Sequence, residues 1–469
     1  MKTTLTSSEK ISHEYCCTIV KIGEIKPIEG ADKIVQTEVE GRTIIIGKDE
    51  VKEGDIMFYV SNECELNKDF LFVNNLFDDP TLNKDPEKKG YINKRGRVRM
   101  IKLRGVYSMG FLFTVEAMKN YFPAFNVEEE NLSERIGEDF DTVDGTLFVK
   151  AYVPPMPESN VRLIGEQRRA KKLAFDRMIS GQFAFMYDTK QLQREISRLN
   201  PDDVVCIDVK VHGTSGIFAN VLCLQPRWGG IYSKIFNYLP KFLQFTKKGY
   251  DVIYSSRTVI KNKTINPKVN GGYYDTDVWG EYYELLKDVI PAGITIYGEI
   301  FGYLSDSTRM IQKGYDYGCN PGENKLMIYR VTKTEEDGSK KEYNINEVMT
   351  FTLKIKDSLQ EIGKDPNKLF LLPLLYHGTL KDLYPEIDPA NHWHENVLEA
   401  LKNDTEHFGM EKKEPLCRNK VPREGICLRI DDDPIAECFK LKALSYLQKE
   451  GAEIDSGTYE DIETQERYE

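Results

Sequence analysis

Residues 208–215 read Asp208-Val209-Lys210-Val211-His212-Gly213-Thr214-Ser215, and this stretch determines how the rest of the chain is interpreted. The apolar run before Lys210 predicts a buried strand, and Gly213 predicts a tight turn after it. Lys210 is therefore expected at a strand end, where a ligand can reach its amine. A lysine attacks phosphorus only as a free amine, so neighbouring cations or desolvation must lower its pKa. Taken alone, the stretch also fits an ordinary lysine at the end of a strand.

A later segment, Cys438-Phe439-Lys440-Leu441-Lys442, has two lysines two positions apart. On a strand, both side chains point to the same face. Two neighbouring ammonium groups repel each other unless an anion lies between them, and a triphosphate is a natural candidate. The same charges favour a deprotonated Lys210. Two solvated lysines on an edge strand remain the alternative for this segment on its own.

Two glutamates, Glu299 and Glu424, each follow an apolar run and adjoin a glycine. A carboxylate at a strand end can accept hydrogen bonds from ribose hydroxyls or hold Mg²⁺ (or Mn²⁺), which needs only one or two carboxylates. Arg257 can bind a phosphate through two hydrogen bonds, and Tyr329 offers a flat surface for a purine ring. Taken alone, each of the charged residues also fits a surface salt bridge. The tyrosine alone also fits a place in the hydrophobic core.

Composition limits the class of protein. The 469 residues are 40% hydrophobic and 30% charged, as in a soluble globular protein of two or three domains. No apolar run approaches the length of a membrane span and the start lacks a signal-peptide core, so we expect an intracellular, cytoplasmic protein without a membrane partner. Nine scattered cysteines with no C-x-x-C pair argue against a disulfide framework and a structural zinc.

The net charge of −11 is unevenly distributed. Residues 450–469 contain eight acids and one arginine, which predicts a solvated acidic tail. Residues 88–104 contain no acid, and a strand over residues 97–100 would place two arginines on one face. A basic face can bind a phosphate backbone whatever the net charge, although an edge strand protected by charge is the alternative. The candidate RNA contacts are Arg97, Arg99, Lys102 and Arg104.

The chain is expected to have two domains. Short β-branched runs broken by glycines between residues 15 and 113 predict a small barrel or sandwich. The proline-rich residues 152–157 predict a boundary, and helical patterns follow over residues 170–199 and 347–362. We expect an N-terminal, RNA-binding domain over residues 1–150, a catalytic domain over 151–449 and the acidic tail over 450–469.

In their order and spacing, these segments resemble the motifs of lysine-adenylating nucleotidyltransferases, the polynucleotide ligases and mRNA capping enzymes. The resemblance implies an α+β fold: a nucleotidyltransferase domain of the ATP-grasp-like ligase type, with antiparallel sheets and helices, after an all-β OB-like barrel. It implies that Lys210 carries the nucleotide and that Glu424 and Glu299 bind the metal. The implied nucleotide-binding residues are Val209, Lys210, Arg257, Glu299, Tyr329, Glu424, Lys440 and Lys442.

The N-terminal segments 26–34 and 97–110, and residues 185–192, look like those of the Deinococcus-type RNA ligases. This resemblance implies an enzyme that uses ATP to join RNA 3′-hydroxyl and 5′-phosphate ends, at nicks in duplexes, through lysyl-AMP and RNA-adenylate intermediates. We expect it to be a monomer. Only 27 residues follow Lys442, which disfavours the DNA ligases and the capping guanylyltransferases. A capping enzyme and an inactive RNA-binding relative stay as alternatives.

Several features depart from the pattern of that group. Val209 stands where ligases often have a glutamate, and Arg330 follows the candidate stacking tyrosine where an aspartate is common. The chain also has extra sequence around residues 227–249 and 388–414.

Overall fold

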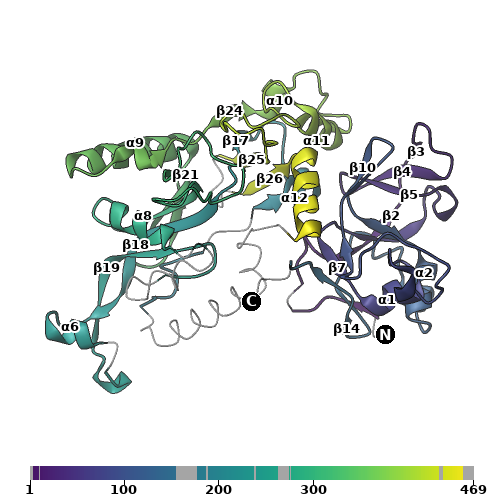
Figure 1. The fold of residues 1–469 in the computed structure, drawn as a ribbon, viewed down its shortest axis with the longest axis horizontal. Helices are drawn as coiled ribbons and strands as arrows, with labels where there is room; N and C mark the ends of the chain where they lie inside the picture. The colour runs from purple at the N-terminus through teal and green to yellow at the C-terminus, as the bar shows by residue number, and fades with distance from the viewer. Residues whose placement is uncertain are drawn as a thin grey trace. The chain divides into compact units, whose positions relative to one another are not determined.

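A computed structural model (Figure 1) describes residues 4–9, 11–154, 177–185, 189–236, 239–261, 274, 276–431 and 437–457. The chain divides into two compact units. Unit 1 comprises Met1–Val153, Lys190–Arg198 and Leu447–Gly457, and unit 2 comprises the remainder. The proline-rich connector beyond residue 154, the start of the helical pattern predicted from residue 170, part of the 185–192 segment and the tail from residue 458 lie outside the described residues.

Unit 1 is built mainly of short strands. Their bounds are β1 (Leu5–Thr6), β2 (Cys17–Lys21), β3 (Ile25–Pro27), β4 (Ile34–Val39), β5 (Arg42–Gly47), β6 (Ile56–Val60), β7 (Cys64–Leu66), β8 (Arg97–Val98), β9 (Ile101–Leu103), β10 (Val106–Ser108), β11 (Phe111–Phe113), β12 (Asp139–Phe140), β13 (Thr142–Val143), β14 (Thr146–Leu147), β15 (Val149–Ala151) and β16 (Lys190–Gln191). The helices are α1 (Lys68–Val73), α2 (Val115–Tyr121), α3 (Val127–Glu130) and α5 (Leu192–Glu195).

The strands of unit 1 form because apolar residues alternate along them. Strands β4 and β5 bury every second side chain, and they pair in register in the sheet β3-β4-β5. A second sheet has the order β11-β6-β2-β12, and its side chains form an aromatic core around Phe58 and Phe113. The short strands predicted between residues 15 and 113 are thus confirmed, with β2, β5 and β6 among them.

Unit 2 contains two antiparallel sheets. The larger has the order β19-β18-β20-β21-β22, with β23 joined in parallel to β21, and the other has the neighbours β26-β25-β17-β24. The bounds are β17 (Val204–Val209), β18 (Thr214–Pro226), β19 (Thr246–Ser255), β20 (Ile294–Gly302), β21 (Asn324–Thr334), β22 (Lys340–Glu342), β23 (Leu369–Phe370), β24 (Leu374–Thr379), β25 (Gly425–Ile430) and β26 (Cys438–Lys442).

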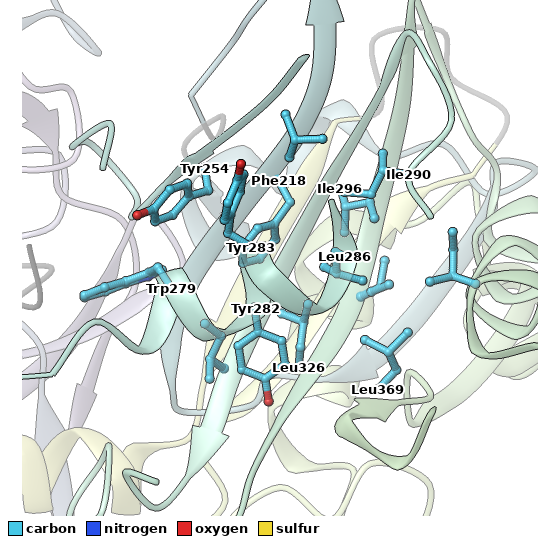
Figure 2. Close-up of a cluster of buried hydrophobic side chains, with 14 of the residues drawn as sticks. Phe218, Tyr254, Trp279, Tyr282, Tyr283, Leu286, Ile290, Ile296, Leu326 and Leu369 are labelled. Carbon is cyan, nitrogen blue, oxygen red and sulfur yellow. The ribbon is translucent and has the colours of Figure 1, made fainter. Parts of the chain in front are cut away.

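Helices cover the larger sheet and form the main core of unit 2. Figure 2 shows Tyr283 and Leu286 of α8 beside Phe218 and Ile296 of the sheet, and Trp279 and Tyr282 belong to the same buried cluster. The helices of the unit are α6 (Ile231–Ile235), α8 (Val278–Leu286), α9 (Ile345–Glu361), α10 (Leu380–Leu383), α11 (Trp393–Asn403) and the start of α12 (Leu444–Ser456). This core holds β18 and β20 in place, and these two strands lie next to the segment that contains Lys210.

Helix α9 confirms the pattern predicted over residues 347–362. Asn344 and Glu347 form a capping box, in which each side chain accepts a hydrogen bond from the other residue's backbone. Residues 450–456, which begin the segment expected to be a tail, are the last turns of α12, where Ile454 is buried. Among the helices that the structure describes, none combines the length and apolar character required to cross a bilayer.

Candidate functional site

Lys210 lies immediately after β17, beside the start of β25. Its backbone N–H donates to the carbonyl of Gly425 at 3.1 Å. In the register of this sheet, Asp208 is opposite Cys427, which is in turn opposite Lys440, and Lys442 is opposite Gly425. Directly opposed residues share a face, so Lys440 and Lys442 do lie on one face, as the sequence predicts. Lys210, two positions after Asp208, falls on this lysine face as well.

The turn after Lys210 is attached to β20 by Glu299. Glu299 Oε1 accepts from the N–H of Gly213 at 3.0 Å, and Ser215 Oγ donates to Oε2 at 3.4 Å. Trp279 in α8 donates its indole N–H to the Ser215 carbonyl at 2.8 Å, which connects the turn to the core. A Cβ built on Gly213 would lie 2.3 Å from the carbonyl oxygen of Ile300. Only glycine therefore allows the turn to approach β20 this closely.

Gly213→Ala is expected to destabilise the protein by about 1–3 kcal/mol. The added methyl group would overlap the backbone of Ile300, which cannot move aside as a flexible side chain can. Urea unfolding measures this change. Gly229→Ala in the same unit is the matched control, since a Cβ there meets nothing within 4 Å. Equal losses of stability in the two variants would contradict the close approach.

Glu424 is the buried acid nearest to the lysine amine. Its Oε1 lies 2.9 Å from Lys210 Nζ and 3.9 Å from Lys442 Nζ, and its side chain is 3% exposed. Its Oε2 lies 3.4 Å from His212 Nδ1 and accepts no hydrogen bond from any group in the described part of the chain. A buried carboxylate oxygen left without a hydrogen bond fits a metal ligand, because a hard divalent cation prefers such an oxygen.

The pair of Lys210 and Glu424 shifts both pKa values. Burial alone would lower the pKa of Lys210, but the Glu424 carboxylate more than offsets it, so the pKa is raised above its usual value. Burial would likewise raise the pKa of Glu424, and Lys210, followed by His212, instead holds it well below its usual range. The Glu424 carboxylate thus favours the protonated form of Lys210, and neutralising the carboxylate would favour the free amine that a nucleophile needs.

The depressed pKa of Glu424 gives a pH-dependent stability with a defined sign. Because the folded pKa lies below the unfolded value of 4.5, this stabilisation is present above pH 4.5 and is lost as the pH falls towards the folded pKa. We expect the wild type to lose about 1.4 kcal/mol more per pH unit below 4.5 than Glu424→Gln, which lacks the titrating group. Denaturant unfolding between pH 6 and 3.5 checks this slope, and parallel curves would contradict it.

The remaining candidate nucleotide contacts come from the two sheets and their edges. Val209 is the buried last residue of β17, and Arg257 follows β19. Tyr329 lies at a bulge: Tyr297 pairs with Arg330 and Gly298 with Ile328, which leaves Tyr329 out of the β20 register. A bulge redirects a side chain from the regular alternation of a strand.

Arg330 replaces the expected aspartate and has a structural role. Its guanidinium forms two hydrogen bonds with Glu342, at 2.7 and 2.9 Å, and both side chains are 8% exposed. This buried ion pair links β21 to β22 at the edge of the larger sheet.

The expectation that Arg97 binds RNA does not fit its surroundings in unit 1. Arg97 is fully buried, and its guanidinium is bound by Glu63 at 2.7 and 2.9 Å and by Asp455 at 2.9 Å. Arg99 binds the other oxygen of Asp455 at 2.9 Å. Since β8 ends at Val98, the predicted strand is also shorter than residues 97–100. The glutamate and the aspartate occupy the position that a phosphate would need.

The other two basic candidates are exposed. Lys102 lies in β9, with its ammonium 4.4 Å from the ring centroid of Tyr107, and Arg104 occupies the turn between β9 and β10 with a positive φ of 50°. The charged side chains of this hairpin are exposed to solvent, whereas the side chain of Arg97 is buried.

Several residues near Glu424 are not predicted from the sequence. The ring of His212 packs edge-on against Tyr315 and Tyr446, and the backbone N–H of His212 donates to the Tyr317 hydroxyl at 2.7 Å. The position of His212 two residues after Lys210 was an available signal. The tyrosines had none, because Tyr315 and Tyr317 come from irregular chain between β20 and β21.

Two kinds of comparison bear on the fold. A family described as an OB-fold domain matches residues 16–115. Among solved structures, a Naegleria gruberi RNA ligase mutant with ATP and Mn is 18% identical with a TM-score of 0.53, covering 92% of this chain and 98% of that one. No curated protein matched the sequence.

Further structures of the same relative agree. A mutant of the Naegleria gruberi RNA ligase with AMP and Mn has a TM-score of 0.53 at 18% identity, covering 93% of this chain and 98% of that one. The structure of that ligase with PPi has a TM-score of 0.51 at 17% identity, with the same coverage of both chains. This chain has an RNA ligase-like fold. The mixed α+β class with an N-terminal OB-fold domain, expected from the sequence, is thereby confirmed.

Proposed function

We propose that this protein is an ATP-dependent RNA ligase, which joins RNA 3′-hydroxyl and 5′-phosphate ends through a covalent lysyl-AMP. The observation that carries the proposal is the amine of Lys210 at a strand end, 2.9 Å from the buried carboxylate of Glu424 and on the same face as Lys440 and Lys442. A reactive lysine with an acid and two further cations is what transfer of a nucleotide to an amine requires. The RNA ligase-like fold supports the same reaction.

In the first step, Lys210 Nζ attacks the α-phosphorus of ATP. An N–P bond forms, the α–β phosphoanhydride bond breaks, pyrophosphate leaves and the amine loses a proton to solvent. Lys440 and Lys442 offset the negative charge of the departing phosphates as point charges. Lys442 is suited to this role because it already lies 3.9 Å from Glu424 Oε1, next to the amine.

The acids have separate roles in this proposal. Glu424 would hold Mg²⁺ or Mn²⁺, and the cation supplies charge neutralisation on the phosphates when bound. Glu299 holds the Gly213 turn through its Oε1 and, as the motif glutamate at the ribose, would share in binding the nucleotide and the metal. Arg257 would contact a phosphate, Tyr329 would stack on the base, and Val209 would leave base recognition at that point to backbone groups.

The second and third steps seal the RNA. A 5′-phosphate oxygen attacks the phosphorus, which breaks the N–P bond and returns Lys210 as an amine. The 3′-hydroxyl then attacks the RNA-adenylate, a phosphodiester forms and AMP leaves. The OB-fold domain would hold the RNA, as in the Deinococcus-type ligases, with Lys102 and Arg104 as the exposed basic contacts.

The proposal is tested with purified protein, Mg²⁺ and α-labelled ATP or GTP, followed by a nicked duplex with an RNA 3′-hydroxyl strand. We expect label on the protein from ATP and a sealed strand with release of AMP. Label from GTP alone would indicate a capping guanylyltransferase. No label from either nucleotide would leave an RNA-binding protein without ligase activity.

A further inference from the structure

The β18–β19 hairpin carries an unusual segment at its end. The two strands pair without interruption from Ile217 and Ser255 out to Pro226 and Thr246. Beyond them, residues 227–245 include α6, which Figure 1 shows at the far end of the hairpin from the larger sheet. We call residues 226–250 the hairpin tip. The proposed ligase chemistry uses none of its residues.

The hairpin tip has an internal framework of its own. The Tyr232 hydroxyl donates to the carbonyl of Leu243 at 2.8 Å and accepts from the N–H of Phe245 at 2.7 Å. The ring of Trp228 packs edge-on against Tyr232 and Phe245, with centroids 5.0 and 5.5 Å apart, and Phe236 is buried beneath them. Because these contacts order the hairpin tip, its exposed apolar side chains are held at the surface.

The exposed side chains of the hairpin tip are strongly apolar. Ile231 and Phe242 are each 78% exposed, and Trp228 is 51% exposed. The other exposed large apolar residues of the tip are Ile235, Leu243, Phe245 and Tyr250. An apolar group of this kind, gathered on one protruding element, marks a surface that is covered in use.

The charge of the hairpin tip restricts what covers it. The sequence from residue 226 to 250 contains five basic residues and no acid, in a chain whose net charge is −11. Arg227, Lys247 and Lys248 are exposed at the base of the tip, close in sequence to the apolar residues. The partner is therefore anionic. The same surface on a second copy of the chain would bring like charges together and is disfavoured.

We propose that the hairpin tip binds the surface of an anionic lipid bilayer. Exposed aliphatic and aromatic side chains enter the boundary between headgroups and acyl chains, while flanking lysine and arginine residues bind the headgroups. Single-stranded RNA would use aromatic faces and basic groups, but it gives no reason to expose Ile231, Ile235 and Leu243. The expectation of no membrane partner rested on the lack of a spanning segment, and surface binding needs no such segment.

The test uses the full-length protein and the fluorescence of Trp228. The chain has three tryptophans, and the other two, Trp279 and Trp393, are 3% and 4% exposed. A blue shift on adding vesicles therefore reports on the hairpin tip. We expect this shift, with co-sedimentation, for phosphatidylcholine vesicles containing phosphatidylglycerol, and a much weaker response for phosphatidylcholine alone. No shift, or an equal shift with both vesicles, would overturn the proposal.

Two sets of variants test the separate contributions. Ile231→Asp with Phe242→Asp removes the most exposed apolar groups and should weaken vesicle binding about tenfold or more. Lys247→Gln with Lys248→Gln should weaken it about tenfold and reduce the preference for anionic vesicles. Leu353→Asp, at an exposed position on α9, is the matched control and should bind normally.

Other readouts separate this proposal from the ligase chemistry. Thermal unfolding checks that each variant folds, and self-adenylation should be unchanged because the proposed ligase chemistry uses none of the substituted residues. Binding of a single-stranded RNA, measured by anisotropy, addresses the other anionic partner. Loss of RNA binding in the Ile231→Asp and Phe242→Asp variant, with vesicle binding intact, would assign the tip to RNA and overturn the membrane proposal.

Discussion

Lys210→Ala is expected to abolish covalent labelling of the protein by α-labelled ATP, with a loss of roughly 10⁴-fold or more. The proposed first step forms a bond to Lys210 Nζ, and alanine has no nucleophile to replace it. A denaturing gel of the protein after incubation with the nucleotide and Mg²⁺ measures the label directly. Lys354→Ala is the matched control, because Lys354 is an exposed lysine on α9 in the same unit.

Lys210→Arg separates charge from nucleophilicity. The guanidinium of arginine stays protonated, so it can pair with Glu424 and preserve the fold but cannot attack phosphorus. We expect this variant to unfold at the wild-type temperature and to take up no label. Label retained by Lys210→Arg would place the covalent bond on another residue and refute the proposed mechanism.

Glu424→Gln is expected to reduce the rate of adenylation by about 10²- to 10³-fold. The glutamine keeps the shape of the side chain but removes the buried carboxylate that pairs with Lys210 and is proposed to bind the divalent cation. The single-turnover rate of adenylation, measured against Mg²⁺ and Mn²⁺ concentration, should show weaker metal dependence in the variant. Glu361→Gln, at an exposed position on α9, is the control.

The same variant distinguishes two roles for Glu424. If the carboxylate did no more than hold a protonated Lys210, its removal would let burial lower the lysine pKa and would make adenylation faster at neutral pH. If it binds the metal, adenylation becomes slower despite the lower lysine pKa. An accelerated Glu424→Gln would thus exclude Glu424 as the proposed metal ligand.

Local pattern predicted much of the arrangement around Lys210. A strand ending at Val209 and a same-face pair of Lys440 and Lys442 follow from alternation within a few residues, and the register of β17, β25 and β26 confirms both. The bulge at Tyr329 could not be predicted, because it depends on how β21 meets β20 and not on the sequence of β21 alone.

Arg97 shows why the basic run over residues 88–104 does not form an exposed basic face along its whole length. Its partners, Glu63 and Asp455, lie 34 and 358 positions away in the sequence, so no local count of charges could include them. A run without acids indicates a charged surface only if no distant acid folds onto it. The exposed Lys102 and Arg104 satisfy that condition, and Arg97 does not.

The ion pair between Lys210 and Glu424 also bears on selectivity towards small reactive metabolites. An ammonium ion has no lone pair, so it does not form imines with aldehydes and is not acylated by thioesters or acyl phosphates. Because the Glu424 carboxylate raises the pKa of Lys210, it lowers the fraction of the lysine that is present as the free amine. The contact with Glu424 would therefore also slow the reaction of the proposed nucleophile with such metabolites.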